Sequence, residues 1–240
     1  MAERCVGGDD RADGYRPVRP DGAPLAAAAQ GIDADGRWIG GALVRAPAIG
    51  LVVGEIGAGK TTLSLRVAGQ ARAQGWRVGG IVTRPLLAPS GSRTGLVAED
   101  LWTGEEQLLA SLERDLGGPR CGRHSFAAGA FAWACRAVEA ALTGGTDLII
   151  LDEVGPLELG AGAGFAPVLG AVLQAPCARL LVVRRAWWKA LAERLPSAPL
   201  IFEVEPNTRD GLAERVVRSL LPQLAAGHAP RESAAPVRER

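Results

Sequence analysis

The sequence predicts an α/β fold in which helices flank a mostly parallel sheet that carries a small antiparallel insertion. Apolar runs alternate along the chain with segments of helical periodicity, as in parallel sheets whose strands are joined by crossover helices. The run Leu148–Leu151 is continuously apolar, which is typical of a strand buried on both faces. A glycine-rich segment follows the first apolar run and precedes the first helical segment. We therefore expect a loop at the end of the first strand.

The elements are expected in the following order. A first strand at Ile49–Val53 leads into a helix at Thr61–Gln74, which stops at Gly75 because glycine readily adopts the conformation of a helix C-terminus. A second strand is expected at Trp76–Thr83. A helix is then expected at Phe131–Leu142, followed by strands at Leu148–Leu151 and Leu180–Val183. The last expected elements are a helix at Trp187–Leu195, a strand at Leu200–Val204 and a helix at Gly211–Leu221.

Residues 84–127 interrupt this alternation. Short strands are expected at Gly95–Trp102, Gln107–Ala110 and Arg123–Ala127, and we interpret the segment as an antiparallel insertion beside the functional site. Residues 1–46 are predicted to form a flexible N-terminal extension, residues 47–224 the folded domain, and residues 225–240 a disordered tail.

Composition limits the classes of partner. The 240 residues carry a formal net charge of +1, so a nucleic-acid-binding role has little support. No apolar stretch approaches the length of a membrane span, and the N-terminus lacks the apolar core of a signal peptide. The four cysteines form no Cys-x-x-Cys pair, so neither a structural zinc site nor a disulfide framework is expected. Reduced thiols are typical of a cytoplasmic protein.

The glycine-rich segment matches the phosphate-loop pattern G-x-x-x-x-G-K-[ST] at every fixed position, between a strand and a helix. Glycines let backbone N–H groups curl around a β-phosphate, and the helix adds its positive end. We expect Lys60 to bridge the β- and γ-phosphates, Thr61 to ligate Mg²⁺ and Thr62 to lie next to the α-phosphate. The expected nucleotide-binding residues are Gly54, Glu55, Ile56, Gly57, Ala58, Gly59, Lys60, Thr61 and Thr62.

The choice of lysine in this loop supports the assignment. Only Lys60 and Lys189 are lysines among 27 basic residues, and all the others are arginines. A compact ammonium group fits between two phosphates on a crowded loop, whereas a planar guanidinium group does not.

Two acidic residues follow the apolar strand. Asp152 occupies the position of a Walker B aspartate that holds Mg²⁺, directly or through water. The adjacent Glu153 is expected to point toward the γ-phosphate and to orient or deprotonate a water molecule, which favours hydrolysis over transfer to a small acceptor. Arg93, Arg120 and Arg123 are candidates for stabilising γ-phosphate charge, with solvated surface arginines as the alternative.

Several motifs together resemble the small P-loop nucleoside-triphosphatase family of archaea, bacteria and animals, which includes the animal cancer-related nucleoside-triphosphatase. The most specific one is Asp152-Glu153-Val154-Gly155-Pro156-Leu157-Glu158-Leu159, similar to the family's Asp-Glu-Ile-Gly-x-Met-Glu-Leu. The segments at 78–83, 93–96, 120–124 and 207–210 also resemble family motifs, although His124 and two other positions lack the family's aromatic residue.

The resemblance, which covers roughly residues 48–222, implies a RecA-like α/β fold. It also implies slow, Mg²⁺-dependent hydrolysis of ATP, GTP and other nucleoside triphosphates (NTPs) to the diphosphate and phosphate, with broad base tolerance. Two alternatives remain open: an NTP-driven regulatory switch that acts on a protein partner, and a nucleoside or nucleotide kinase. Against the kinase, no arginine-rich lid segment follows the fourth strand.

Overall fold

A computed structural model describes residues 48–205 and 211–221 of the chain. The expected extension at 1–46, the tail at 225–240 and the segment Asn207-Thr208-Arg209-Asp210 lie outside the described residues. The division of the chain into extension, domain and tail therefore stays a prediction.

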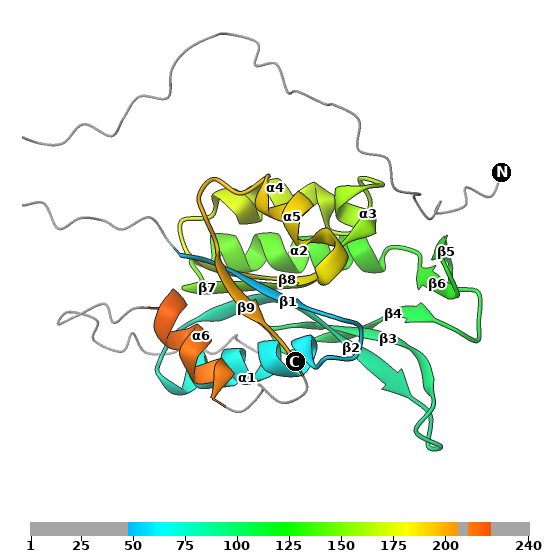
Figure 1. Cartoon of the computed structure of the whole chain (residues 1–240). Coiled ribbons are helices and arrows are strands. Elements are labelled where there is room, and N and C mark those ends of the chain that lie inside the picture. The colour runs from blue at the N-terminus through cyan, green and yellow to red at the C-terminus, as the bar shows by residue number, and fades with distance from the viewer. Residues whose placement is uncertain (1–47, 206–210, 222–240) are drawn as a thin grey trace, which may run out of the picture. The chain divides into compact units, whose positions relative to one another are not determined.

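The described strands form one sheet in the order β5-β6-β4-β3-β2-β7-β8-β1-β9 (Figure 1). Its parallel part consists of β2 (Val78–Leu87), β7 (Leu148–Val154), β8 (Ala178–Arg184), β1 (Ile49–Gly54) and β9 (Leu200–Glu203). Its antiparallel part continues from β2 through β3 (Arg93–Asp100), β4 (Glu106–Ser111), β6 (His124–Ala127) and β5 (Gly117–Cys121). The antiparallel strands thus extend the same sheet at its β2 edge.

Helices cover both faces of the sheet. The helices α1 (Lys60–Ala73) and α6 (Leu212–Leu220) lie on one face, and α2 (Ala130–Thr143), α3 (Pro156–Leu159), α4 (Ala166–Gln174) and α5 (Trp188–Ala192) lie on the other (Figure 1). A 3₁₀ turn at Arg185–Trp187 precedes α5. The predicted α/β class, a mostly parallel sheet flanked by helices, is confirmed. No helix among the described residues is long and apolar enough to cross a membrane.

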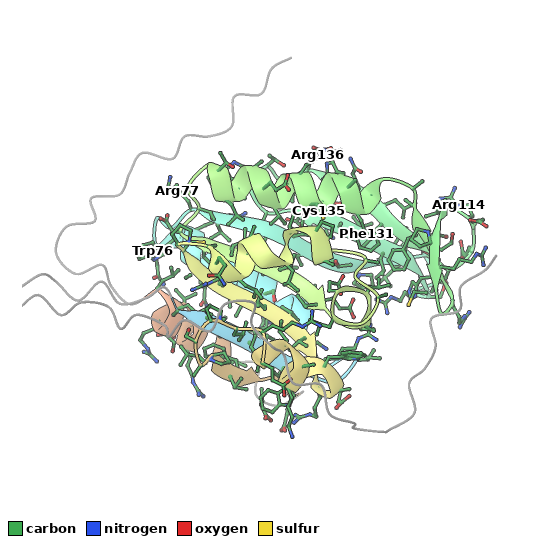
Figure 2. All side chains as sticks on the ribbon, turned by 90° about the horizontal axis from the view of Figure 1, so that it is seen from above. Trp76, Arg77, Arg114, Phe131, Cys135 and Arg136 are labelled. Atoms are coloured by element: carbon green, nitrogen blue, oxygen red, sulfur yellow. The ribbon has the colours of Figure 1, made fainter. Side chains whose placement is uncertain are left out.

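Side-chain alternation on the central strands supplies a core on each face. In β7, Ile149 and Leu151 belong to the core on the α2 side, whereas Leu148 and Ile150 belong to the core on the α1 side. All four are fully buried, which explains why this strand is apolar at every position. Helix α2 directs Phe131 and Cys135 toward the other helices, while Arg136 lies on its outer side (Figure 2).

Two glycines allow β2 to approach its neighbours closely. A Cβ atom on Gly79 would lie 2.5 Å from Ala141 of α2, and one on Gly80 would lie 1.9 Å from the carbonyl oxygen of Ile150 in β7. Gly80 also has a φ of 109°, which other residues rarely adopt. The absence of side chains at Gly79 and Gly80 therefore lets α2 and β7 pack closely against β2, the strand that joins the two parts of the sheet.

Helix α1 ends as the sequence predicts. Gly75 adopts a φ of 85° directly after the helix, and its backbone N–H donates to the carbonyl of Arg72. The N–H of Trp76 donates to the carbonyl of Ala71, which completes a Schellman motif.

Several elements differ from expectation. Strand β2 runs on to Leu87 because it pairs with β3, and Pro85 is tolerated there because the pairing with β7 has already ended at Ile81. The helix expected at Trp187–Leu195 is divided into the 3₁₀ turn and the short α5. The helices α3 and α4 were not predicted. In α4, Val168 and Val172 are buried at helical spacing, but the segment is short and contains Pro167 and a glycine, which are not typical of a helix interior.

Candidate nucleotide site

The predicted phosphate loop, residues 55–59, joins the carboxyl end of β1 to the start of α1. Gly57 and Gly59 have φ values of 79° and 95°, so both use the left-handed conformation that a tight loop requires. Lys60 begins α1, and its Nζ donates to the carbonyl oxygens of Gly54 at 3.0 Å and Glu55 at 2.8 Å. The ammonium group therefore lies across the loop and is bound by the loop's own backbone.

The Lys60 side chain is almost fully buried, at 8% exposed. Burial lowers the pKa of its ammonium group, and the nearby carboxylates of Glu153 and Asp152 oppose this effect. Asp152 and Glu153 end β7, so the structure places the two predicted motifs close enough for their charges to interact.

Thr61 and Asp152 meet directly. The Thr61 hydroxyl donates to Asp152 Oδ2 at 2.7 Å, and the backbone N–H of Thr83 at 3.4 Å is a second, weaker donor to the same oxygen. Asp152 is only 2% exposed. Burial raises the pKa of this carboxyl group to about 7, against the opposing effect of the Thr61 hydrogen bond. Sequence reasoning missed Thr83 as a contact of Asp152.

The donor set at Thr61 and Asp152 fits Mg²⁺. Hard cations prefer oxygen ligands, and Mg²⁺ usually binds one or two protein groups together with substrate phosphates and waters. A hydroxyl and a buried carboxylate in contact, facing the phosphate loop, supply such a pair. The described residues contain no group of three or more His, Cys, Asp or Glu side chains that could hold a metal. An ion at this position would thus depend on phosphate oxygens as well.

Glu153 is held in an unusual backbone conformation. Among the described residues it alone has a positive φ without being glycine, at 71°. The pairing of β7 with β8 shifts between Leu151 and Val154, so that β7 contains one extra residue at this point. Such bulges redirect side chains next to functional sites, and a left-handed non-glycine residue is a form of stored backbone strain. The bulge therefore lies at the position of the two adjacent acids.

Glu153 has a partner that was not among the predicted site residues. Nε and Nη2 of Arg184 donate to Glu153 Oε1 at 3.1 and 2.6 Å. Arg184 is the last residue of β8, the strand next to β7, and therefore reaches the same edge of the sheet. From sequence alone, its position after the expected strand Leu180–Val183 allows a sensor role at the edge where ligands bind, but a solvated turn is the favoured interpretation of that position.

Arg93 lies on β3, Arg120 lies on β5, and Arg123 lies in the turn between β5 and β6; all three are exposed. Arg120 forms an ion pair with Asp115 at 3.0 Å. Burial is the main cause that lowers the pKa of His124, and the charges of Arg93 and Arg123 lower it further. Arg184 also lowers this pKa, whereas Glu153 raises it. Arg93 and Arg123 thus share an electrostatic neighbour, His124, with Glu153 and Arg184. Contact of any of them with a γ-phosphate stays a prediction.

His124 lies between these charges. Its Nε2 is buried and has no hydrogen-bond partner among the described residues, and its ring lies 6.2 Å from that of Phe126. Further ring contacts join Phe126 to Phe131 and Phe131 to Phe165. This row of rings connects the insertion with α2 and with the loop before α4.

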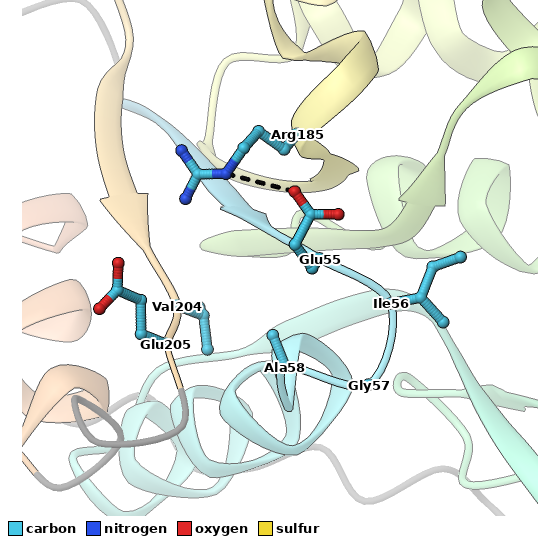
Figure 3. Close-up of a pocket in the computed structure, with 7 residues that line it drawn as sticks. All are labelled: Glu55, Ile56, Gly57, Ala58, Arg185, Val204 and Glu205. Carbon is cyan, nitrogen blue, oxygen red and sulfur yellow. Dashed lines mark ion pairs between the residues drawn. The ribbon is translucent and has the colours of Figure 1, made fainter.

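A cavity of about 420 Å³ opens on the β9 side of the phosphate loop (Figure 3). It is lined by Glu55, Ile56, Gly57, Ala58, Arg185, Val204 and Glu205. Arg185 pairs with Glu55 at 3.5 Å and with Glu203 at 3.2 Å, so the cavity combines apolar walls with paired charges. Ile56 is 71% exposed at the loop.

The sequence matches a known protein family over most of the described residues. A family model described as NTPase matches residues 50–217. The nucleoside-triphosphatase THEP1 of Methanothermobacter thermautotrophicus is 33% identical over 168 residues, which is 70% of this chain and 92% of the relative. The protein of the same name from Pyrococcus abyssi is 38% identical over 171 residues, covering 70% and 90%.

Two solved structures share the fold at 21% identity. The crystal structure of THEP1 from Aquifex aeolicus has a TM-score of 0.53 and covers 72% of this chain and 98% of its own. The solution structure of a human cancer-related nucleoside triphosphatase has a TM-score of 0.58 and covers 75% and 100%. Both likenesses concern the arrangement of helices and strands.

Proposed function

The chain belongs to the NTPase family whose model spans residues 50–217, and from this premise we propose that Lys60, Thr61, Asp152 and Glu153 form its hydrolytic site. The protein hydrolyses nucleoside triphosphates, the activity for which its relatives are named. One observation carries the assignment of the site: the Thr61 hydroxyl of the phosphate loop contacts Asp152 at 2.7 Å, while Glu153 projects from a strained bulge beside it.

Each side chain has a distinct task in this proposal. Lys60 exchanges the carbonyls of Gly54 and Glu55 for oxygens of the β- and γ-phosphates. Glu153 orients a water molecule whose oxygen bonds to the γ-phosphorus, and it accepts the proton that the water loses. The bond from the γ-phosphorus to the β–γ bridging oxygen breaks, and its electron pair leaves with the diphosphate. The products are a nucleoside diphosphate and inorganic phosphate.

Thr61 and Asp152 would hold Mg²⁺ together with the substrate. When bound there, the ion would neutralise charge on the β- and γ-phosphates. The amide of Asp152→Asn keeps the shape of the side chain but loses its charge. We expect this variant to need at least about tenfold more Mg²⁺ for half-maximal turnover. A Mg²⁺ titration of phosphate release measures this, and an unchanged midpoint would remove Asp152 from the metal site.

The decisive experiment measures phosphate release from ATP, GTP, CTP and UTP with Mg²⁺, in the absence of any acceptor. Glu153→Gln keeps the size of the side chain, and we expect it to lower turnover by about two orders of magnitude or more while nucleotide still binds. Glu139→Gln, an exposed substitution on α2, serves as the matched control. Equal phosphate release by the two variants would show that Glu153 is not the catalytic group.

A further inference from the structure

Arg184 and Glu153 form an ion pair inside the candidate site. Two nitrogens of one guanidinium group donate to a single carboxylate oxygen, Glu153 Oε1. An oxygen that accepts two such donors is directed at the guanidinium group and is poorly placed to bind an attacking water molecule. In this arrangement Arg184 fixes the Glu153 side chain, and Oε1 does not accept a proton from water.

The pair is suited to exchange of partners. The Arg184 and Glu153 side chains are 39% and 37% exposed, and ion pairs that solvent reaches contribute little to stability. The bulge and the positive φ place the Glu153 backbone independently of Arg184. Breaking the pair therefore leaves Glu153 in position and makes its carboxylate available.

Arg184 also lies on the phosphate side of the site. It ends β8, which lies between β7 and the phosphate-loop strand β1. Its charge contributes to lowering the pKa of the Lys60 ammonium group, the group expected between the β- and γ-phosphates. Lys60 and Arg184 thus place two positive groups near Glu153, an arrangement that favours a multiply charged phosphate.

The other arginines of this edge are differently engaged. Arg84 pairs with Glu99 and Glu106, and Arg185 pairs with Glu55 and Glu203. None of these carboxylates is a candidate for activating water. The pair of Arg184 with Glu153, by contrast, couples a phosphate-side cation to the candidate base.

We propose that Arg184 senses the third phosphate by changing partner: it holds Glu153 in the nucleotide-free site and moves to the γ-phosphate when a triphosphate binds. A guanidinium group binds phosphate oxygens through two parallel hydrogen bonds, and the γ-phosphate carries more charge than a carboxylate. A diphosphate lacks this group, so the pair with Glu153 persists. The inference rests on the proposed function and makes Arg184 a positioning residue that is also specific for triphosphates.

Binding separates this proposal from the hydrolytic one. The affinities of ADP and of the ATP analogue with a β–γ imido bridge are measured by calorimetry, in Mg²⁺ buffer, for the wild type, Arg184→Gln and Arg184→Lys. In Arg184→Gln we expect the affinity for the analogue to fall at least about tenfold, because charge-assisted hydrogen bonds are lost, and the ADP affinity to stay within about twofold. Arg184→Lys keeps the positive charge but lacks the two parallel N–H donors of the guanidinium group, so its affinity for the analogue should lie between those of the wild type and Arg184→Gln.

Turnover provides the second readout. For Arg184→Gln we expect kcat to fall by about 10²–10³, toward the lower end of what arginine contributes at a transferring phosphoryl group. The control Arg218→Gln, on the exposed part of α6, should retain both the wild-type affinities and kcat. Thermal unfolding should show both variants folded, since the pairs that they break are exposed.

Two results would overturn the proposal. A lower kcat with an unchanged ratio of analogue to ADP affinity would mean that Arg184 only braces Glu153. An equal loss of affinity for both nucleotides would mean that it contributes to the shape of the site and does not sense the third phosphate. Failure of the hydrolytic proposal is seen separately, as undiminished phosphate release by Glu153→Gln with the wild-type affinity ratio intact.

Discussion

Lys60 and Asp152 are buried groups of opposite charge type in the candidate site. Burial lowers the pKa of the lysine and raises that of the aspartate, so each ionised form is disfavoured where it stands. The loop carbonyls bind one and the Thr61 hydroxyl binds the other. These contacts satisfy the polar atoms of both side chains within the protein.

The first prediction concerns Lys60. Lys60→Ala removes the ammonium group, whose hydrogen bonds reach only the carbonyls of its own loop, so the domain should stay folded. We expect NTP affinity to fall by about two orders of magnitude or more, because a buried charged contact to phosphate is lost. Isothermal titration calorimetry measures this affinity. Lys189→Ala, at the chain's other lysine, is the control and should bind normally. Normal affinity in folded Lys60→Ala would refute the phosphate-loop assignment.

At the scale of elements, patterns of apolar residues predicted strands better than short helices. The runs at Leu148–Leu151 and Leu180–Val183 lie inside β7 and β8, because burial on both faces leaves only apolar residues there. The bulge after Leu151 was not predictable, since its cause is the register with β8. For the same reason the motif predicted the acids Asp152 and Glu153 but not the arginine that pairs with one of them.

Glu158 illustrates what a motif alone does not specify. Its carboxylate accepts the backbone N–H of Gly155 at 2.8 Å, which fits a residue in the first turn of α3. It also accepts the N–H of Phe165 at 3.1 Å and so closes the loop before α4. The motif thus includes a structural clamp beside the candidate catalytic acids.

The second prediction follows from this clamp. Glu158→Gln replaces one of the two acceptor oxygens by a donor, so one buried N–H loses its partner at a cost of about 1–3 kcal/mol. Burial raises the pKa of Glu158, so the folded state binds its proton more tightly than the unfolded state. The stability that this carboxyl group adds is greatest below its unfolded pKa and is lost as pH rises through the raised folded pKa.

Urea unfolding of the wild type and the variant tests this prediction. The destabilisation by Glu158→Gln should be larger at about pH 5 than at about pH 8. Glu214→Gln, at an exposed position of α6, should stay within about 0.5 kcal/mol of the wild type at both. A difference that does not vary with pH would show that Glu158 titrates normally.

The third prediction concerns the antiparallel strands. Arg93 and Arg123 act on the same imidazole as Glu153 and Arg184, whereas Arg120 is exposed and paired with Asp115. We expect Arg93→Ala or Arg123→Ala to lower kcat by about tenfold or more, through lost charge at the γ-phosphate, and Arg120→Ala to lower it less. Steady-state phosphate release measures all three. If none lowers kcat, the missing charge must come from Arg184 or from a protein partner.

At the scale of the whole molecule, the order of the strands explains how the site forms. The carboxyl ends of β1, β7 and β8 meet at one edge of the sheet, which brings together the loop, the acids and Arg184 from three distant segments. Alternating apolar runs predicted the parallel architecture. They did not predict that the antiparallel strands extend the same sheet, because that pairing depends on the long β2 and its bulge opposite β3.

The last prediction is base tolerance. Guanine-specific GTPases read the base with an Asn-Lys-x-Asp loop, and the corresponding segment here is Asn207-Thr208-Arg209-Asp210, which lacks the lysine and lies outside the described residues. The cavity on the β9 side of the phosphate loop presents apolar groups of Ile56, Ala58 and Val204, which suit any base. We expect turnover of ATP and GTP to differ by less than about tenfold, or about 1.4 kcal/mol.

Competition assays with the four NTPs measure this directly, and Asp210→Ala is the informative variant. If affinity comes mainly from the triphosphate and the groups that hold it, the substitution changes kcat/KM for ATP and GTP by the same small factor. A carboxylate that accepted hydrogen bonds from the guanine edge would instead add a selective contact, whose loss falls on GTP alone. A roughly hundredfold preference for GTP that disappears in Asp210→Ala would therefore identify the segment as a base reader, and the triphosphate would no longer account for most of the affinity.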